Sequence, residues 1–320
     1  MLFQQATHDI SSLVGASTIV PVVGYAANQH PYLAPQNPQY RFRKDLLRPV
    51  LATWQQAVTR RPHDPARGLL LTGPSGAGKT SLVCQLFARL NVPVFVFDAS
   101  RSMDLNDAIR TVGLQDGDTV EQYGGIIQAM TGGYPVLINE FDVLKPEEAT
   151  VLYSILDNGR CATPDGQVFT AAPGFMVVLT ANTNGTGDET GLYAGTRRQS
   201  AALTRRVRVI EVGYMDIADE KDVLKKHFPG MTDQALDPIL RVMTQVRSAA
   251  SDPASGILRG ISTDEVIAWI QDAAFAAGME RDGLNPFVEC LMWNYGNALP
   301  ADAAASVRTI AEGIFGGAVP

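Results

Sequence analysis

One stretch of the sequence has the residue types and spacing of a polyphosphate-binding loop. The pattern G-x-x-x-x-G-K-[ST] is matched in full by Gly73-Pro74-Ser75-Gly76-Ala77-Gly78-Lys79-Thr80. Glycines let the backbone curl, so that successive N–H groups point at phosphate oxygens. Lys79 would reach the terminal phosphates, and Thr80 would give a hydroxyl ligand to Mg²⁺. We therefore expect Gly73 to Ser81 to bind ATP with Mg²⁺; the simpler alternative is a glycine-rich turn with an exposed lysine.

A second strand must deliver polar groups to the metal and to the attacking water, and Tyr134 to Asp142 is the best candidate. Glu140, near its end, would orient and polarise the water that attacks the terminal phosphate. The usual pattern has an aspartate where Asn139 stands. Asn139 can still hold Mg²⁺ through a bound water, but it brings no negative charge, so we expect weaker Mg²⁺ affinity. The alternative is a strand end with a solvated carboxylate.

A third strand ends in the residues Leu179-Thr180-Ala181-Asn182-Thr183. If this tip lies beside Glu140, the amide of Asn182 can hydrogen-bond the attacking water or the terminal phosphate. Taken alone, an asparagine at a strand end is more often a turn residue.

An arginine cluster follows in an otherwise acidic chain, formed by Arg197, Arg198, Arg205, Arg206 and Arg208. A planar guanidinium suits phosphate recognition, and an arginine finger stabilises charge in the transition state of phosphoryl transfer. Because the cluster is remote in sequence from the phosphate-binding loop, the nucleotide of a neighbouring subunit is a plausible target. The alternative is a solvated basic face with surface ion pairs.

The elements that must position these residues alternate between short apolar runs and helical patterns. Strands are expected at 68–72, 92–97, 134–141, 175–180 and 207–212, and helices at 45–60, 80–90 and 146–156. Buried apolar strands separated by helices predict an α/β fold with a parallel sheet flanked by helices. A hairpin is expected within 158–175. The first ~40 residues are expected to be irregular, with a loop from Asn28 to Tyr40.

Beyond Tyr214 the pattern changes to helices alone. They are expected at 218–227, 233–250, 263–277 and 286–298. A boundary near Met215 then gives three parts. These are an N-terminal segment with its leading helix (1–60), an α/β nucleotide-binding domain (61–215) and a helical domain (216–320).

The composition excludes several classes of protein. The 320 residues are 46% hydrophobic and 18% charged, which is enough apolar material for a sizeable core. A net charge of -7 argues against a general nucleic-acid binder. The 3 cysteines fit neither a zinc site nor a disulfide framework, and the 4 scattered histidines form no metal cluster. With neither a signal-peptide pattern nor a membrane-spanning run, the default expectation is a soluble cytoplasmic protein.

Together, these motifs resemble an AAA+ ATPase of the MoxR-related branch. The resemblance rests on the phosphate-binding loop, on Asn139-Glu140-Phe141-Asp142 and on Thr180-Ala181-Asn182. Within that branch, the stretch from Thr180 to Thr196 closely resembles the CobS-like motor subunit of aerobic cobalt chelatases. The similarity runs from about Gly68 to Val223 and is looser in the helical tail.

The resemblance implies an α/β core with a helical lid and an ATP-dependent hexameric ring, with the nucleotide between subunits. By position, Lys79 and Thr80 belong to Walker A and Asn139 and Glu140 to Walker B, while Asn182 matches sensor 1. The family's finger arginine matches Arg205, with Arg206 as a rival. Family members often work with a partner that carries a von Willebrand A domain. In the chelatase, the ring drives cobalt insertion into a corrin precursor.

Two departures from the family pattern leave the function open. Asn139 replaces the Walker B aspartate, and Ser262-Thr263-Asp264 stands where Ser-Pro-Arg is usual, so that the sensor 2 arginine is missing unless Arg259 substitutes. The first hypothesis is therefore an ATP-hydrolysing ring motor that remodels a partner complex. The second is a nucleotide-gated scaffold with little turnover. A monomeric kinase would leave Asn182 and Arg205 unexplained.

Overall fold

A computed structural model gives the fold of the chain. It describes residues 4–61, 64–66, 68–115, 118–163, 166–183, 187, 195–257, 259–278 and 285–316. The chain forms two compact units. The first contains Met1–Gly73 and Lys79–Val212, and the second contains Pro74–Gly78 and Gly213–Pro320. The chain thus passes into the second unit after Val212, and the five residues at the tip of the phosphate-binding loop group with that unit.

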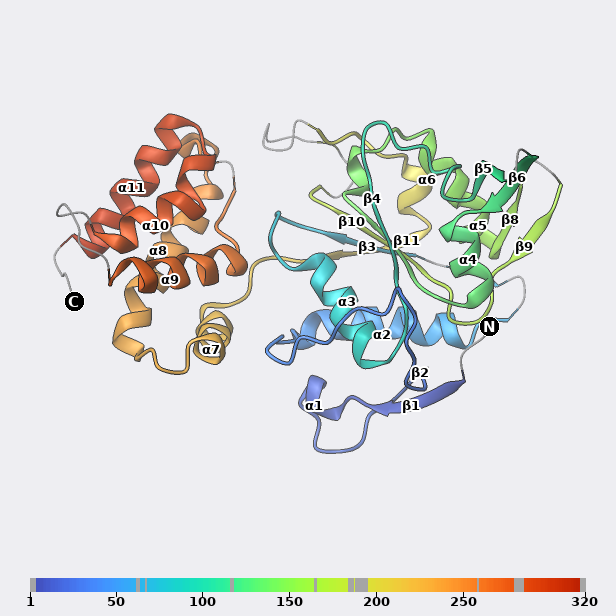
Figure 1. The fold of residues 1–320 in the computed structure, drawn as a ribbon, viewed down its shortest axis with the longest axis horizontal. Helices are drawn as coiled ribbons and strands as arrows, with labels where there is room; N and C mark the ends of the chain where they lie inside the picture. Colours follow the sequence, from blue (N-terminus) through green and yellow to red (C-terminus); the bar gives the residue numbers. More distant parts are fainter. Residues whose placement is uncertain are drawn as a thin grey trace. The chain divides into compact units, whose positions relative to one another are not determined.

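A parallel sheet forms the centre of the first unit (Figure 1). Among the described residues it has five strands in the order β11-β3-β10-β7-β4. Their bounds are Val207–Glu211, Gly68–Thr72, Val177–Ala181, Val136–Asn139 and Phe95–Asp98. Every neighbouring pair is parallel. The predicted α/β fold is confirmed, because β3 and β10 are apolar runs buried on both faces, as parallel strands between helix layers must be.

Helices flank this sheet in the first unit. They are α2 (Lys44–Val58), α3 (Lys79–Arg89), α4 (Gly125–Gly132), α5 (Val151–Asn158) and the short α6 (Ala201–Thr204), with 3₁₀ turns η1 (Phe141–Val143) and η2 (Glu148–Thr150). The apolar stripe that predicted a helix at 45–60 becomes the buried face of α2. Trp54 on this face is fully buried and meets Phe87 of α3 edge to face, with ring centroids 5.0 Å apart. Figure 1 shows α2 and α3 side by side.

The start of the chain is more ordered than the sequence suggested. The expectation of an irregular beginning is wrong for β1 (Gln5–Asp9) and β2 (Pro21–Tyr25), which pair antiparallel, and for the short α1 (Ser11–Val14) between them. Long-range contacts hold this hairpin: the Trp54 indole N–H donates to the Val23 carbonyl at 2.6 Å, and the Tyr25 hydroxyl donates to the Gly133 carbonyl at 2.8 Å. Such contacts leave no local pattern. The expected loop at 28–40 contains no helix or strand.

Two more hairpins extend the first unit. The expected one consists of β8 (Arg160–Ala162) and β9 (Val168–Thr170). The other, β5 (Arg110–Gln115) with β6 (Asp118–Tyr123), was not expected, and neither was α4.

The second unit is helical, as predicted. Its elements are α7 (Ile217–His227), α8 (Asp233–Ala250), η3 (Pro253–Ser255), α9 (Thr263–Ala276), α10 (Pro286–Asn294), η4 (Gly296–Ala298) and α11 (Ala301–Phe315). Its core contains the fully buried Trp269 and Tyr295, and Phe287 stacks on Phe315 with centroids 5.1 Å apart. Ser262 caps α9 through a reciprocal pair of hydrogen bonds with Glu265. The alanine-rich α11 was not expected.

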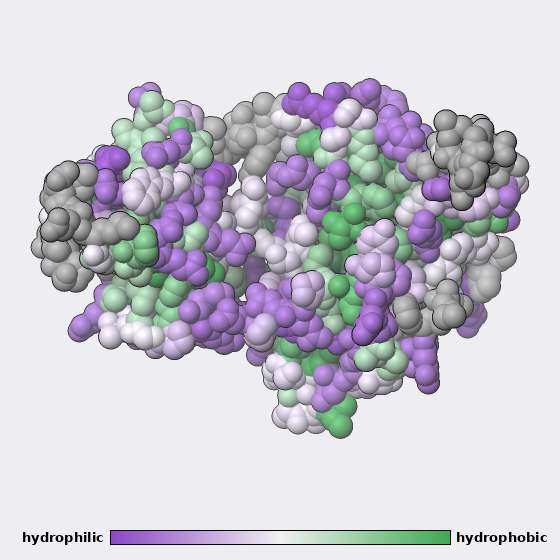
Figure 2. All heavy atoms as spheres, in the orientation of Figure 1, coloured by the Kyte–Doolittle hydropathy of each residue, from purple (hydrophilic) through white to green (hydrophobic). Residues whose placement is uncertain are grey.

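None of the helices in the described parts of the chain combines the length with the apolar character needed to cross a membrane. On the face seen in Figure 2, hydrophilic residues are interspersed with smaller hydrophobic areas, which is the mixed surface common among folded proteins.

Candidate functional site

The sheet topology gathers the motif residues at one edge. Strands β3, β10, β7 and β4 are parallel neighbours, so their carboxyl ends lie together. Gly73 follows β3, Asn139 closes β7, Asn182 follows β10 and Asp98 closes β4. This edge is where open parallel sheets place their ligands. The phosphate-binding loop, Asn139 and Asn182, which are far apart in the sequence, are thereby brought to one edge of the sheet, as the motifs required.

Lys79 lies at the centre of this edge and is only 8% exposed. Its ammonium donates to the Gly73 carbonyl at 2.7 Å and to Oδ1 of Asn182 at 3.1 Å. Burial lowers the pKa of Lys79 from 10.5 to about 8, although the nearby charges of Asp142 and Glu140 act in the opposite direction. A cation held in this way is well suited to a polyanion, because added negative charge offsets the cost of burying it.

Thr80 and Asn139 are joined by a hydrogen bond. The Thr80 hydroxyl donates to Oδ1 of Asn139 at 2.7 Å, and the Thr180 hydroxyl donates to the same oxygen at 3.3 Å. The other end of the amide, Nδ2, donates to Oδ1 of Asp98 at 2.8 Å. Asp98 stands directly opposite Asn139 in the β4–β7 register. Asp98 was not among the predicted site residues, although an acidic residue directly after the strand expected at 92–97 was an available signal.

Glu140 leaves β7 in an unusual backbone conformation. Its φ of 51° and ψ of 39° lie in the left-handed region, which a non-glycine residue rarely adopts. Its N–H donates to the Thr180 hydroxyl at 3.2 Å, and its side chain is exposed. Strain of this kind costs on the order of 1–3 kcal/mol and is concentrated at functional sites. The structure thus turns the carboxylate of Glu140 out into solvent directly after the sheet edge.

Asp142 holds the tip of β10. The side chain is completely buried, and its Oδ2 accepts the N–H of Asn182 at 2.9 Å, the N–H of Thr183 at 3.0 Å and the Thr183 hydroxyl at 3.1 Å. Its Oδ1 is buried without a hydrogen-bond partner among the described residues. In the sequence, Asp142 stands at the end of the motif Asn139-Glu140-Phe141-Asp142 and was not predicted to have a role of its own. An aspartate inside the apolar run from Phe141 to Leu144 was the signal for a buried role.

The two candidate finger arginines differ in their surroundings. Arg206 forms a bidentate pair with Asp157, at 2.7 and 2.6 Å, and its guanidinium lies 4.6 Å from the centre of the Tyr153 ring. Arg205 is exposed, and its side chain makes no hydrogen bond or ion pair with the parts of the chain that the structure describes. The structure therefore leaves Arg205 available to another molecule and engages Arg206 within its own chain.

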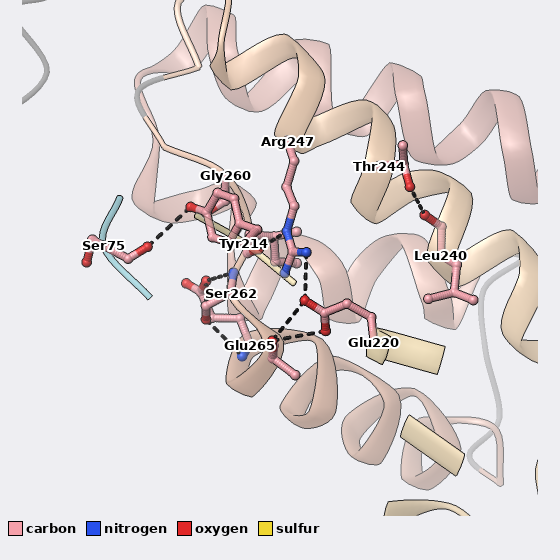
Figure 3. A network of polar contacts seen from close by, with 11 residues as sticks. Ser75, Tyr214, Glu220, Leu240, Thr244, Arg247, Gly260, Ser262 and Glu265 are labelled. Carbon is pink, nitrogen blue, oxygen red and sulfur yellow. Dashed lines mark hydrogen bonds and ion pairs between the residues drawn. The ribbon is translucent and has the colours of Figure 1, made fainter. Parts of the chain in front are cut away.

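The tip of the phosphate-binding loop, Pro74–Gly78, packs with helical-unit residues (Figure 3). The hydroxyl of Tyr214 lies 3.2 Å from the Ser75 carbonyl and 3.1 Å from the Gly260 carbonyl. The ring of Tyr214 lies under the guanidinium of Arg247, 4.3 Å from its centre. At Gly76, where φ is +76°, an added Cβ would come 2.5 Å from the Cβ of Ser262. Glycine is required there both by the backbone conformation and by this close approach.

Two ion pairs lie within the same helical unit, and Figure 3 draws the one between Arg247 and Glu220. Arg247 donates to the buried carboxylate of Glu220 at 2.7 Å. Arg259, considered above as a substitute for the missing sensor 2 arginine, forms a bidentate pair with Glu265, at 2.8 and 2.6 Å. Both arginines are therefore engaged within the helical unit. Asp264 stands in the first turn of α9, where a negative charge favours the helix N-terminus.

The donor set at the sheet edge fits Mg²⁺ better than a transition metal. Among the described residues, no group of three or more His, Cys, Asp or Glu side chains could hold a metal by itself. The groups present are the hydroxyl of Thr80, the amide oxygen of Asn139 and the carboxylate of Asp98, all hard oxygen donors. Mg²⁺ is usually held by few protein oxygens together with substrate phosphates. The residues therefore fit a Mg²⁺–nucleotide complex.

Sequence comparisons agree with the fold. Residues 68–207 match the family described as AAA domain (dynein-related subfamily). The matched range contains Lys79, Asn139, Glu140, Asn182 and Arg205. The stretch from Thr180 to Thr196, which suggested the CobS-like resemblance, falls partly outside the described residues, at 184–186 and 188–194.

Curated relatives match more than half of the chain. An uncharacterized protein of Staphylococcus haemolyticus is 30% identical over 213 residues, which are 63% of this chain and 78% of that protein. Uncharacterized proteins of Staphylococcus epidermidis and Staphylococcus saprophyticus are each 31% identical over 202 residues, or 59% of this chain and 74% of each relative. The chain thus belongs to the family of these staphylococcal proteins and carries, at residues 68–207, an AAA domain of the dynein-related subfamily.

Proposed function

We propose that this protein is a Mg²⁺-dependent ATPase of the AAA+ class. The observation that carries the proposal is the position of Lys79, whose buried ammonium joins the Gly73 carbonyl to the Asn182 amide at the carboxyl edge of the sheet. A lysine that binds phosphate and a polar residue beside it can both contact the terminal phosphate of a nucleotide.

The remaining residues divide the work in this proposal. The backbone N–H groups from Gly73 to Ser81 bind the phosphates, and Lys79 offsets their charge. Thr80 and Asn139 hold Mg²⁺, the latter through water; when bound, Mg²⁺ neutralises charge on the phosphate oxygens. Glu140, exposed at the end of β7, accepts a proton from the attacking water. Asn182 contacts the terminal phosphate or that water.

The finer assignment follows the family resemblance. We place the chain in a homo-oligomeric ring, hexameric by analogy, in which Arg205 of one subunit completes the nucleotide site of the next. The exposure of Arg205, compared with the Asp157-bound Arg206, supports this choice. The ring would remodel a partner complex, and a CobS-like role beside a von Willebrand A domain protein, including metal insertion, is the most specific form of the proposal.

A nucleotide-gated scaffold is the second candidate. It is favoured by the neutral Asn139 and by Asp264 in place of a sensor arginine. In that case ATP would promote assembly through differential binding, with little turnover.

Turnover by the purified chain, together with particle imaging, tests the two candidates. A motor would hydrolyse ATP in the presence of Mg²⁺, and Lys79→Ala and Glu140→Gln would abolish this activity. A scaffold would bind ATP and assemble, but its wild-type rate would equal that of Glu140→Gln. If Lys79→Ala keeps full activity, the hydrolysis comes from another protein and the proposed site is wrong. Rings that form only with a slowly hydrolysed ATP analogue would support the intersubunit site.

A further inference from the structure

We propose that Asp98 supplies, through Asn139, the negative charge that β7 lacks at its Mg²⁺ position, where Asn139 stands in place of the usual aspartate. This inference rests on the proposed function and deepens it, because it adds a positioning residue to the same site. The carboxylate lies on the neighbouring strand: β4 ends in Asp98, and β7 ends in Asn139, whose amide is proposed to hold Mg²⁺.

The sheet register makes this pairing direct. Asp98 and Asn139 are opposed residues of parallel neighbours, and Nδ2 of Asn139 donates to Oδ1 of Asp98 at 2.8 Å. With Nδ2 committed to Asp98, the amide oxygen must face the other way. There it accepts the hydroxyl of Thr80 at 2.7 Å. Asp98 therefore fixes which end of the Asn139 amide faces the phosphate-binding loop.

The charge of Asp98 is not used elsewhere. In the described parts of the chain, its carboxylate makes no ion pair and no hydrogen bond other than the one to Asn139. The two other acids nearby have different surroundings: Asp142 is buried against the backbone of Asn182, and Glu140 is exposed beyond β7. Asp98 is exposed, and no ion pair within the described parts of the chain offsets its carboxylate.

Two physical effects would transmit this charge to a divalent cation. A hydrogen bond to a carboxylate is charge-assisted and polarises the amide, which makes its oxygen a better acceptor. The carboxylate also attracts the cation directly, through an interaction that solvent weakens but does not remove at distances below the screening length. A neutral amide backed by a carboxylate can thus replace much of the aspartate that the usual pattern has at this position.

A binding titration without turnover tests the inference. A fluorescent ATP analogue is titrated against the full-length chain at a series of Mg²⁺ concentrations and in EDTA. The key variant is Asp98→Asn, which keeps an oxygen to accept the Asn139 hydrogen bond and loses only the charge. We expect it to need roughly tenfold more Mg²⁺ for half-maximal binding, with unchanged binding in EDTA. In Asp98→Asn with Asn139→Asp, the charge returns to β7, and the Mg²⁺ requirement should return to the wild-type value.

The other possible results of this titration distinguish a failure of the inference from a failure of the proposed function. A Mg²⁺ titration of Asp98→Asn that superimposes on wild type overturns the inference and leaves the proposed function intact. An equal loss of binding with Mg²⁺ and in EDTA also overturns it, since Asp98 then acts on the pocket and not on the metal. A double variant that behaves like Asp98→Asn does the same. If wild type and Lys79→Ala bind the analogue equally poorly, the proposed function fails and the inference fails with it.

Discussion

Asp142 fixes the position of Asn182: one oxygen of its buried carboxylate accepts the Asn182 N–H at 2.9 Å. The same oxygen accepts two donors from Thr183. The side-chain oxygen of Asn182 in turn accepts a hydrogen bond from the Lys79 ammonium. A residue from the turn after β7 therefore sets the geometry of a residue after β10, and both strands contribute to one site.

Replacing this carboxylate should reduce stability and activity together. Asp142→Ala removes the acceptor of three buried or half-buried donors and should cost about 2–4 kcal/mol of unfolding free energy. Asp142→Asn keeps an acceptor and should cost less. Denaturant unfolding measures both losses, and ATP turnover should fall more in the alanine variant. Equal stability of wild type and Asp142→Ala would contradict the role of this carboxylate in holding β10.

The buried Lys79 should make the nucleotide-free protein more stable as pH rises. Its pKa is about 8 in the folded protein against 10.5 ordinarily, so between these values the unfolded chain binds more protons and folding gains stability with rising pH. Relative to Lys79→Met, wild type should therefore gain on the order of 2 kcal/mol between pH 7.5 and 10. Denaturant unfolding of both proteins at several pH values is the measurement. Parallel stability curves would show that Lys79 keeps its ordinary pKa.

ATP binding should take up a proton near pH 8.5. A bound polyphosphate stabilises the charged ammonium of Lys79, so the nucleotide raises a pKa that burial has lowered to about 8. Calorimetric titration in two buffers of different ionisation enthalpy measures this uptake. Lys79→Arg should bind ATP without it, because a guanidinium stays protonated at this pH. Identical uptake by both proteins would assign the proton to another group.

Arg205 and Arg206 should separate into a functional and a structural role. Arg206→Ala removes the pair with Asp157 and should lower the midpoint of denaturant unfolding only slightly, because solvent-exposed ion pairs contribute little to stability. Arg205→Ala should unfold like wild type and bind ATP normally, but turnover should drop by roughly 10³-fold if Arg205 acts as the finger.

A mixing experiment tests whether Arg205 acts on a neighbour. Arg205→Ala supplies an intact Lys79, and Lys79→Ala supplies an intact Arg205, so mixed rings should recover part of the turnover that each variant lacks. Two inactive proteins that stay inactive when mixed would argue against completion of the site by another subunit.

Tyr214 should restrain the tip of the phosphate-binding loop. Tyr214→Phe keeps the ring under Arg247 but removes the hydroxyl that reaches the Ser75 and Gly260 carbonyls, which should cost about 0.5–1.5 kcal/mol. Hydrogen exchange of the amides from 75 to 78 should become faster. Tyr295→Phe is the matched control, since its hydroxyl contacts the Arg259 carbonyl instead. If the loop amides exchange at the same rate in Tyr214→Phe, the hydroxyl does not order this loop.

Much of the fold was predictable because its signals are local. The strand at Gly68–Thr72 and the helix at Asp233–Ala250 have the predicted bounds, since an apolar run and an amphipathic stripe define them. The hairpin β1–β2 was missed because short strands with mixed exposure depend on contacts across the fold, and the hairpin β5–β6 was missed as well. Trp54, whose indole N–H holds β2, is 31 residues from its acceptor at Val23.

For the candidate site, too, local motifs were predictable and contacts across the fold were not. Motif spacing predicted Lys79 and Thr80, and the position of Asn182 at a strand tip, together with the family resemblance, predicted Asn182. The structure joins Lys79 to Asn182 and Thr80 to Asn139. Asp98 and Asp142 were missed because their importance depends on sheet register and burial, which no linear motif records. A parallel sheet brings strand ends together regardless of how far apart they are in the chain.

The hydrogen bond between Trp54 of α2 and Val23 of the N-terminal hairpin limits where this protein can be shortened. The sequence suggested an α/β nucleotide-binding domain that starts at residue 61, whereas the first compact unit also includes residues 1–60. Cutting there would remove α2 and expose the fully buried Phe87 of α3 to water. A fragment that begins at residue 61 would therefore be prone to aggregation during expression, and the N-terminal segment with α2 must be retained for biochemical work.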